Sequence, residues 1–276
     1  MSRIRAAALQ PVVPRDAPIE GESTAVKVEI WSDVVCPWCY IGKRRFEAAL
    51  SRFAHRDQVE VEWKSFELDP GARSASAALP DDAAGPAAAG PDYADRLAKK
   101  YGTTRDGAQQ MLESMTVAAA EEGLDFHFER AVAANTFDAH QVIAFAGERD
   151  AQDQVKERLL RAYFTEGESV GDRPSLVRLA AEAGLEAAEV EKVLETQEYA
   201  EVVRADEARA GALGISGVPF FVVDRKYGVS GAQPPEQLLQ VLERAWSESR
   251  PLTMVAPRDS GDSDGAGVCG PDGCVP

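Results

Sequence analysis

The sequence predicts an α/β protein in which one mixed sheet receives a large helical insertion. Residues 27–68 have the pattern strand, helix, strand, which is typical of a parallel crossover. Residues 92–213 are helical in pattern. Residues 219–246 then have the pattern strand, strand, helix. The crossover and the terminal hairpin therefore share one sheet, and the helical block lies between them in the chain.

The first unit is defined by alternating and periodic apolar residues. Residues 27–31 alternate and are rich in strand formers, and residues 59–68 alternate again. Between them a helix begins after Cys36 and ends near Phe53. Pro37 suits the first helical position, where the N–H that proline lacks has no partner in any case. The sequence therefore places Cys36 at the N-cap of this helix.

A change of composition marks the start of the helical block. Residues 70–91 are rich in Ala, Pro, Gly and Asp and predict a loop or flexible insert. Glycines then punctuate the helical pattern, and Asn135 or Thr136 caps one of its helices. We expect a folded unit over residues 26–250, with the helical insertion at about 92–213.

Both ends of the chain are predicted to be disordered. In the leader, residues 1–25, the apolar run is too short and too interrupted for a signal peptide, so we expect an unprocessed leader and a cytoplasmic protein. Residues 251–276 form a tail rich in Pro, Asp, Ser and Gly that carries Cys269 and Cys274. The segment 270–273, Gly-Pro-Asp-Gly, suits a type I turn, which brings these two cysteines within disulfide distance.

Composition restricts the function. The chain has 276 residues, 45% of them hydrophobic, which is enough for a sizeable core. A formal net charge of -16 repels phosphate backbones and anionic membranes, so nucleic-acid and membrane-surface roles are disfavoured. The four cysteines form two close pairs, a pattern that indicates redox chemistry or a metal rather than a disulfide-stapled scaffold.

The motif Cys36-Pro37-Trp38-Cys39 predicts thiol–disulfide exchange. The thiolate is the nucleophile, and a helix N-terminus favours an anion. We therefore expect a lowered pKa at Cys36, the attacking group, and we expect Cys39 to resolve the mixed disulfide. Pro37 stiffens the turn and Trp38 offers an apolar surface, and we expect both residues, together with Val218, to bind the substrate. A zinc half-site is the alternative for two such cysteines, but a helix-capping cysteine followed by proline favours redox chemistry.

Several other residues are candidates for the site, and most of them have two interpretations. Val218-Pro219 precedes an apolar strand; a cis bond presents a backbone edge to a bound polypeptide, whereas a trans proline merely opens the strand. His140 lines the substrate groove or is structural. Asp33 is a buried proton acceptor or ends its strand, and Lys43 is expected to be solvated. No histidine has a second ligand at metal spacing, so we expect no metal, and the chemistry needs no organic cofactor.

Three segments resemble the DsbA family, in its FrnE-like branch. Residues 30–42 (IWSDVVCPWCYIG) resemble the active-site segment, and residues 217–221 (GVPFF) resemble the cis-proline segment. Residues 135–140 (NTFDAH) are similar to a helix start in the inserted domain. The resemblance covers roughly residues 26–247. It implies a thioredoxin fold with a large inserted α-helical domain, disulfide oxidoreductase or isomerase activity, and a cis bond at Pro219.

The same family adjoins the 2-hydroxychromene-2-carboxylate isomerases and kappa-class glutathione transferases. These relatives typically have serine where this chain has Cys36, and they use the thiol of glutathione. The presence of both Cys36 and Cys39 favours a protein disulfide oxidoreductase/isomerase whose partners are protein or small-molecule disulfides and thiols. In a reducing cytosol, reduction, isomerisation or stress-dependent oxidation fits better than net oxidation.

Three alternatives remain open. The first is a glutathione-using isomerase or transferase acting on a small aromatic or polyketide substrate. The second is a zinc-stabilised binding module that uses all four cysteines. The third concerns the tail: we expect Cys269 and Cys274 to be an accessory redox pair that exchanges with the active site or guards it from overoxidation, but an incidental exposed pair is the other interpretation.

Overall fold

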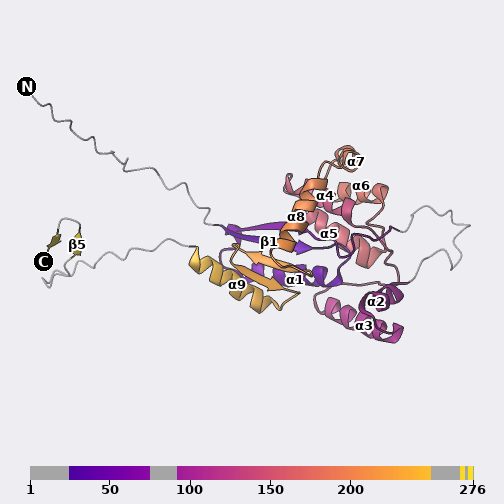
Figure 1. The fold of residues 1–276 in the computed structure, drawn as a ribbon, viewed down its shortest axis with the longest axis horizontal. Helices are drawn as coiled ribbons and strands as arrows, with labels where there is room; N and C mark the ends of the chain where they lie inside the picture. The colour runs from indigo at the N-terminus through magenta and orange to yellow at the C-terminus, as the bar shows by residue number, and fades with distance from the viewer. Residues whose placement is uncertain (1–24, 75–91, 250–267, 271–272, 276) are drawn as a thin grey trace, which may run out of the picture.

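A computed structural model describes residues 25–74, 92–249, 268–270 and 273–275 of the chain. The predicted order of strands and helices is confirmed, with a helical block between the second and third strands (Figure 1). No helix in the described ranges is both long enough and apolar enough to cross a membrane. The predicted loop at 75–91 and nearly all of the predicted leader lie outside the described residues.

The main sheet has four strands in the order β2-β1-β3-β4. β1 (Val26–Ser32) and β2 (Val59–Ser65) pair in parallel, and α1 (Pro37–Arg52) is the crossover that parallel strands require. β3 (Phe220–Val223) lies antiparallel on the other side of β1, and β4 (Tyr227–Ser230) completes a hairpin with β3. A short 3-10 helix, η1 (Arg56–Gln58), precedes β2. The strand that leads into the cysteines is therefore an inner strand.

One face of the sheet is covered by α1 and α9 (Pro235–Glu248), which lie side by side (Figure 1). Ile30 of β1 and Phe221 of β3 belong to the core on this face. The ring of Phe46 on α1 stacks on Phe221 with 5.7 Å between centroids. Because strand side chains alternate between faces, these apolar residues hold the cysteine-bearing helix on the sheet.

The opposite face packs against α8 (Ala200–Ala212), the last helix of the insertion. Trp31 forms a separate apolar cluster with Ala210 and Val222, and its indole N–H donates to the carbonyl of Asp206 at 3.0 Å. Next to this cluster, both oxygens of the buried Glu29 accept from Arg209 on α8, each at 2.7 Å. Apolar contact and a bidentate ion pair together fix the insertion to the sheet.

The insertion is a set of short helices joined by ordered turns. In chain order these are α2 (Tyr93–Tyr101), α3 (Arg105–Glu121), α4 (Phe137–Gly147), α5 (Gln152–Arg161), the π-helical turn η2 (Ala162–Glu166), α6 (Arg173–Glu182), α7 (Ala187–Thr196) and α8. The helical pattern is interrupted over 122–136, where Gly123 takes a positive φ of 74° after α3. Thr136 occupies the N-cap position of α4 without a capping hydrogen bond from its side chain, whereas the side chain of Asn135 accepts from the Phe137 N–H at 3.0 Å.

The tail contains two short strands that the sequence did not predict. β5 (Val268–Gly270) and β6 (Gly273–Val275) pair antiparallel, with Cys269 directly opposite Cys274. The α-carbons of opposed residues in such a pair are about 4.5–5.5 Å apart. This separation lies within the range that a disulfide spans. The centre of the predicted turn, residues 271–272, is outside the described residues.

Candidate active site

Cys36 lies where β1 leads into α1. It is the N-cap residue, with extended backbone (φ -96°, ψ 113°), and Pro37 follows at the start of the helix. The Cys36 N–H donates to the carbonyl of Asp33 at 3.3 Å, and the Cys39 N–H donates to the carbonyl of Cys36 at 3.0 Å. Both cysteines are free thiols, 4% and 0% exposed. The predicted local structure of the motif is confirmed, and the pair is almost fully buried.

The Val218–Pro219 segment reaches the first cysteine from the far end of the sequence. The peptide bond between these two residues is cis, as predicted. The Cys36 thiol donates to the carbonyl of Val218 at 3.5 Å, a contact between residues 182 positions apart. Pro219 is buried and Val218 is half-buried. The two segments singled out in the sequence therefore form one site.

Gly42 allows α1 to approach this proline. A β-carbon at position 42 would lie 2.9 Å from Cγ of Pro219, a distance that forces a shift of one of the two segments. Gly42 is part of the segment that resembles the DsbA active site, and the structure gives its physical role. Because glycine has no side chain, the cysteine-bearing helix can pack directly against the cis-proline turn.

The pKa of Cys36 lies well above the ordinary cysteine value. The hydrogen-bonding contact with the Cys39 thiol contributes most, followed by burial and by the negative charges of Cys39 and Asp33. The bond to the Val218 carbonyl also requires a protonated thiol. The backbone N–H of Cys39 acts in the opposite direction but completes no capping hydrogen bond to the sulfur. The expected lowering of the Cys36 pKa is therefore wrong for the site in which both cysteines are reduced.

Asp33 and His140 form a buried contact beside the cysteines. Both side chains are 1% exposed, and Nε2 of His140 lies 3.3 Å from Oδ1 of Asp33. The other carboxylate oxygen accepts from the Leu68 N–H at 2.8 Å. Burial by itself raises the pKa of Asp33, but His140, the Leu68 N–H and the charge of Lys156 together hold it below its ordinary value.

This arrangement decides between the interpretations of both residues. A carboxyl group with a lowered pKa stays ionised at neutral pH and is a poor proton acceptor, so Asp33 is a fixed buried anion. His140 was expected to line the substrate groove. Its ring faces a protein carboxylate and is shielded from solvent, so the geometry does not support a direct substrate contact.

Lys156 of α5 is a buried cation that the sequence analysis did not identify. It is 1% exposed, and its ammonium group donates to the carbonyl of Ser32 at 3.3 Å. Burial lowers its pKa to about 8, although the thiols and Asp33 act in the opposite direction. The available signal was its position: Lys156 shares the buried stripe of its helix with Leu159 and Leu160.

Lys43 is a second buried lysine, and its expected solvation is wrong. It is 2% exposed and forms ion pairs with Glu47, with Asp153 at 3.1 Å and with Glu157 at 3.2 Å. The last two carboxylates belong to α5, so Lys43 joins the cysteine-bearing helix to the insertion. Nothing in the sequence around Lys43 indicated that this lysine would pair with carboxylates of a distant helix.

The exposed part of the site is apolar. Trp38 is 40% exposed, whereas its neighbour Pro37 is buried. Val35, Val218 and Phe220 are partly exposed around the cysteine segment and the cis-proline segment. These side chains are accessible, and the predicted substrate contacts of Trp38 and Val218, like that of the buried Pro37, stay predictions.

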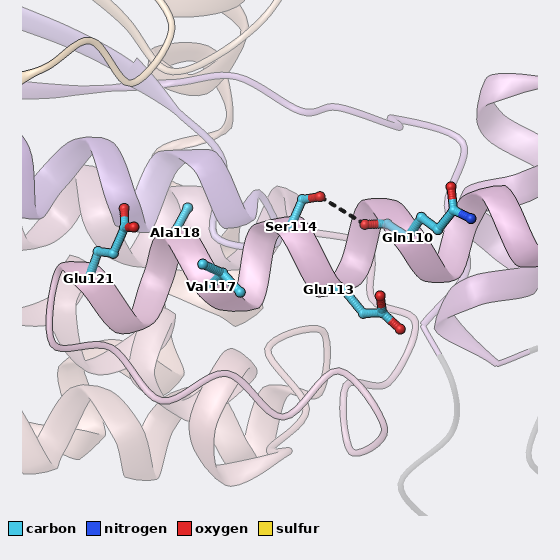
Figure 2. Close-up of a pocket in the computed structure, with 6 residues that line it drawn as sticks. All are labelled: Gln110, Glu113, Ser114, Val117, Ala118 and Glu121. Carbon is cyan, nitrogen blue, oxygen red and sulfur yellow. Dashed lines mark hydrogen bonds between the residues drawn. The ribbon is translucent and has the colours of Figure 1, made fainter.

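An open depression of about 610 Å³ lies on the surface of α3 (Figure 2). Its lining residues all belong to that helix: Gln110, Glu113, Ser114, Val117, Ala118 and Glu121. Neither Cys36 nor Cys39 lines it, so the depression is not part of the cysteine site.

In the described part of the chain, no three His, Cys, Asp or Glu residues are grouped so that they could hold a metal ion. The side chains of Cys269 and Cys274, which the zinc alternative requires, fall outside that description.

Comparison with known proteins decides the family. A model of the DSBA-like thioredoxin domain matches residues 27–243. The chain belongs to this family. Within it, a probable DsbA oxidoreductase from Streptomyces coelicolor is 44% identical, with a TM-score of 0.72 over 91% of this chain and 98% of that one. The predicted thioredoxin fold with an inserted helical region is thus confirmed for a DSBA-like chain.

Two other relatives extend the comparison. The uncharacterized protein YwbO of Bacillus subtilis is 30% identical over 200 residues, which are 72% of this DSBA-like chain and 86% of YwbO. The cytosolic disulfide reductase DsbM of Pseudomonas aeruginosa, in its structure with GSH, is 19% identical with a TM-score of 0.52. That match covers 79% of this chain and 98% of DsbM. At that identity, DsbM shares the fold.

Replacement of Gly42 by alanine should impair the site. The added methyl group meets Pro219, so Gly42→Ala should lower the free energy of unfolding by about 1–3 kcal/mol and slow the reaction of Cys36 with disulfides. Gly211→Ala is the matched control, because a β-carbon at this position in α8 has no neighbour within 4 Å. The control should gain about 0.5–1 kcal/mol. Denaturant unfolding measures both; equal stability of the two variants would contradict the packing argument.

The raised pKa of Cys36 predicts slow alkylation near neutral pH. Only the thiolate reacts, so the rate of carbamidomethylation at Cys36 should keep rising to above about pH 9. Cys39→Ala removes the largest cause of the shift and should move this rise to lower pH. Peptide mass spectrometry of the reduced chain measures the rate at each pH. If the alkylation rate at Cys36 in the unchanged chain levels off below neutral pH, the prediction of a raised pKa is contradicted.

Proposed function

We propose that this DSBA-like chain is a thiol–disulfide oxidoreductase and isomerase that acts on protein disulfides. The observation that carries the proposal is the arrangement of two free thiols in the first turn of α1, with Cys36 against the Val218 carbonyl beside the cis bond to Pro219. A dithiol of this kind exchanges two electrons with a disulfide and needs no metal or organic cofactor.

In the reductive direction, the Cys36 thiolate attacks one sulfur of the substrate disulfide. A bond forms between Cys36 and that sulfur, and the other substrate sulfur leaves as a thiolate and takes up a proton. Cys39 then attacks Cys36, which forms the internal disulfide and releases the second substrate thiol. In isomerisation, a different thiolate of the substrate attacks the substrate sulfur of the mixed disulfide, so a new substrate disulfide forms and Cys36 leaves as a thiolate.

The surroundings of Cys36 suggest how a polypeptide is recognised. When the thiol ionises, its bond to Val218 ends, and the Val218 carbonyl becomes free to accept from the backbone N–H of an extended substrate. The exposed indole of Trp38 offers an adjacent apolar contact. Backbone pairing together with an apolar contact favours unfolded or partly folded proteins, and small disulfides such as oxidised glutathione can react at the same sulfur.

The charge around the thiols supports one direction of electron flow. A dithiol is a strong oxidant when its reduced form is stabilised. Here the pKa of Cys36 is raised, so the reduced form gains little from thiolate stabilisation. This favours a reductase or isomerase over a net oxidant, a direction that suits the reducing cytoplasm, where we place the protein. Its motifs favour the FrnE-like branch of the family.

Insulin reduction tests the proposed activity. With dithiothreitol as the electron donor, the unchanged chain should accelerate insulin precipitation without glutathione. Cys36→Ser should abolish this acceleration because the attacking sulfur is lost. Cys39→Ser should instead accumulate mixed disulfides, detectable by mass, because attack proceeds without resolution.

The outcome also separates the main alternative. An enzyme that uses the thiol of glutathione should need glutathione for turnover and should keep its activity in Cys36→Ser. Activity of that pattern, or full insulin reduction by Cys36→Ser, contradicts the proposed mechanism.

We further propose that Cys269 and Cys274 form the accessory redox pair expected from the sequence, since their strands place them opposite each other. The double variant Cys269→Ser/Cys274→Ser keeps the tail but removes its thiols. It should lose insulin reduction after peroxide treatment faster than the unchanged chain. A truncation after Arg250 should behave in the same way. If both match the unchanged chain in reduction, in recovery of scrambled disulfides and in peroxide resistance, the pair has no redox role.

A further inference from the structure

Lys156 is a buried cation without a carboxylate partner in the described ranges. Its ammonium group contacts the Ser32 carbonyl at 3.3 Å and lies 5.6 Å from the ring centroid of Trp63. Among the described residues, no carboxylate oxygen lies within 4.0 Å of it. Lys43 is equally buried but has three carboxylates around it. A buried charge is costly unless an opposite charge compensates it, so the surroundings of Lys156 call for an anion.

The groups that face Lys156 are few. Cys39 has the largest favourable influence on its charge, followed by Asp33 and Cys36, while Lys43 opposes it. Asp33 is already held by His140 and by the Leu68 N–H. The carboxylates nearest to Lys43 are occupied by that lysine. The two thiols are therefore the anions still available to Lys156. Contacts between the two helices place Cys39 on this side of the site: Tyr40, which follows Cys39, donates to Glu157, which follows Lys156, at 2.7 Å.

Cys39 needs such a partner at one point of the exchange reaction. In the mixed disulfide, Cys36 is bonded to the substrate and carries no charge. Cys39 must then ionise to attack, although it is 0% exposed and water cannot stabilise the thiolate. The cations of α1 are already paired. Lys43 is engaged by Glu47, Asp153 and Glu157, and carboxylates also pair with the three arginines of this helix, Arg44, Arg45 and Arg52.

We propose that Lys156, carried by α5 of the inserted helical region, is the charge partner of the Cys39 thiolate in the resolving step. This inference rests on the proposed exchange function and adds a positioning residue to it. Lys156 makes no bond to the substrate and acts only through Cys39. The inserted region thereby contributes to the reaction as well as covering the sheet.

The step is balanced as follows. The Cys39 thiol releases its proton to solvent, and the resulting thiolate is stabilised by the Lys156 ammonium group. The Cys39 sulfur attacks Cys36, so the bond between the two cysteines forms while the bond from Cys36 to the substrate sulfur breaks. The departing substrate thiolate takes up a proton from solvent. The cysteine pair loses two electrons, and the substrate disulfide gains them.

An aromatic disulfide, dithiobis-nitrobenzoate, separates the two steps in the full-length chain. Attack by Cys36 releases one coloured thiolate, and resolution by Cys39 releases the second from the mixed disulfide. Lys156→Met has a similar shape and no charge, so it should slow the second phase about tenfold near neutral pH and move its pH dependence upward. The first phase should change much less. Lys156→Arg, which retains a cation, should restore part of the second-phase rate.

Leu159→Ala, at a buried position on the same helix, is the structural control. It should lower thermal stability without altering the pH dependence of the second phase. Lys156→Gln serves as a second neutral variant if Lys156→Met does not fold. A folded neutral variant with an unchanged second phase at every pH overturns the role of Lys156, while the exchange function stands. If the unchanged chain releases no coloured thiolate through Cys36, the exchange function fails and this inference fails with it.

Discussion

Burial of the thiol pair is the constraint on which the rest of the site depends. Cys36 and Cys39 are nearly inaccessible to water, and an ionised Asp33 lies in the same region. Negative charge is expensive there unless the protein supplies donors and cations. The partners of these groups come from segments that are remote in sequence: the Leu68 N–H donates to Asp33, and the Val218 carbonyl accepts from Cys36, which keeps this cysteine a neutral thiol.

The helical insertion is therefore part of the site. His140 of α4 faces Asp33, and Lys156 of α5 contacts the carbonyl of Ser32, the residue before Asp33. The same insertion is held on the sheet by the pair of Glu29 and Arg209 and by the cluster around Trp31. The position of the insertion therefore affects the charge at the cysteines. The helices that cover the sheet also carry the groups that compensate the buried negative charges of the site.

Much of this architecture could be predicted from the sequence, because local patterns determine it. Alternation over 27–31 and 59–68 and the Pro37 signal were enough for the crossover. The cis bond at Pro219 was expected only from the family resemblance of the GVPFF segment, because the residues alone left a trans bond open. The charge of the site could not be predicted in the same way. The helix N-terminus and the Cys39 contact are both local features of the first helical turn, but the burial that also raises the pKa of Cys36, and the Val218 carbonyl that accepts from its thiol, depend on tertiary packing. Lys156 was missed for the same reason, since its partners come from β1 and α1.

A raised pKa at an attacking cysteine has a consequence for selectivity. The protonated thiol reacts slowly with peroxide and with free disulfides, because both reactions need the thiolate. In the binding mode proposed above, a substrate that pairs with the Val218 carbonyl competes for the acceptor of the thiol proton, so binding and activation of Cys36 are linked. After the first attack of the proposed reaction, the negative charge passes to Cys39, for which we propose Lys156 as the charge partner. In this mechanism the outer sulfur is ionised when a substrate is bound, and the inner sulfur is ionised in the mixed disulfide. This order of ionisation protects a dithiol between turnovers and still permits its resolution.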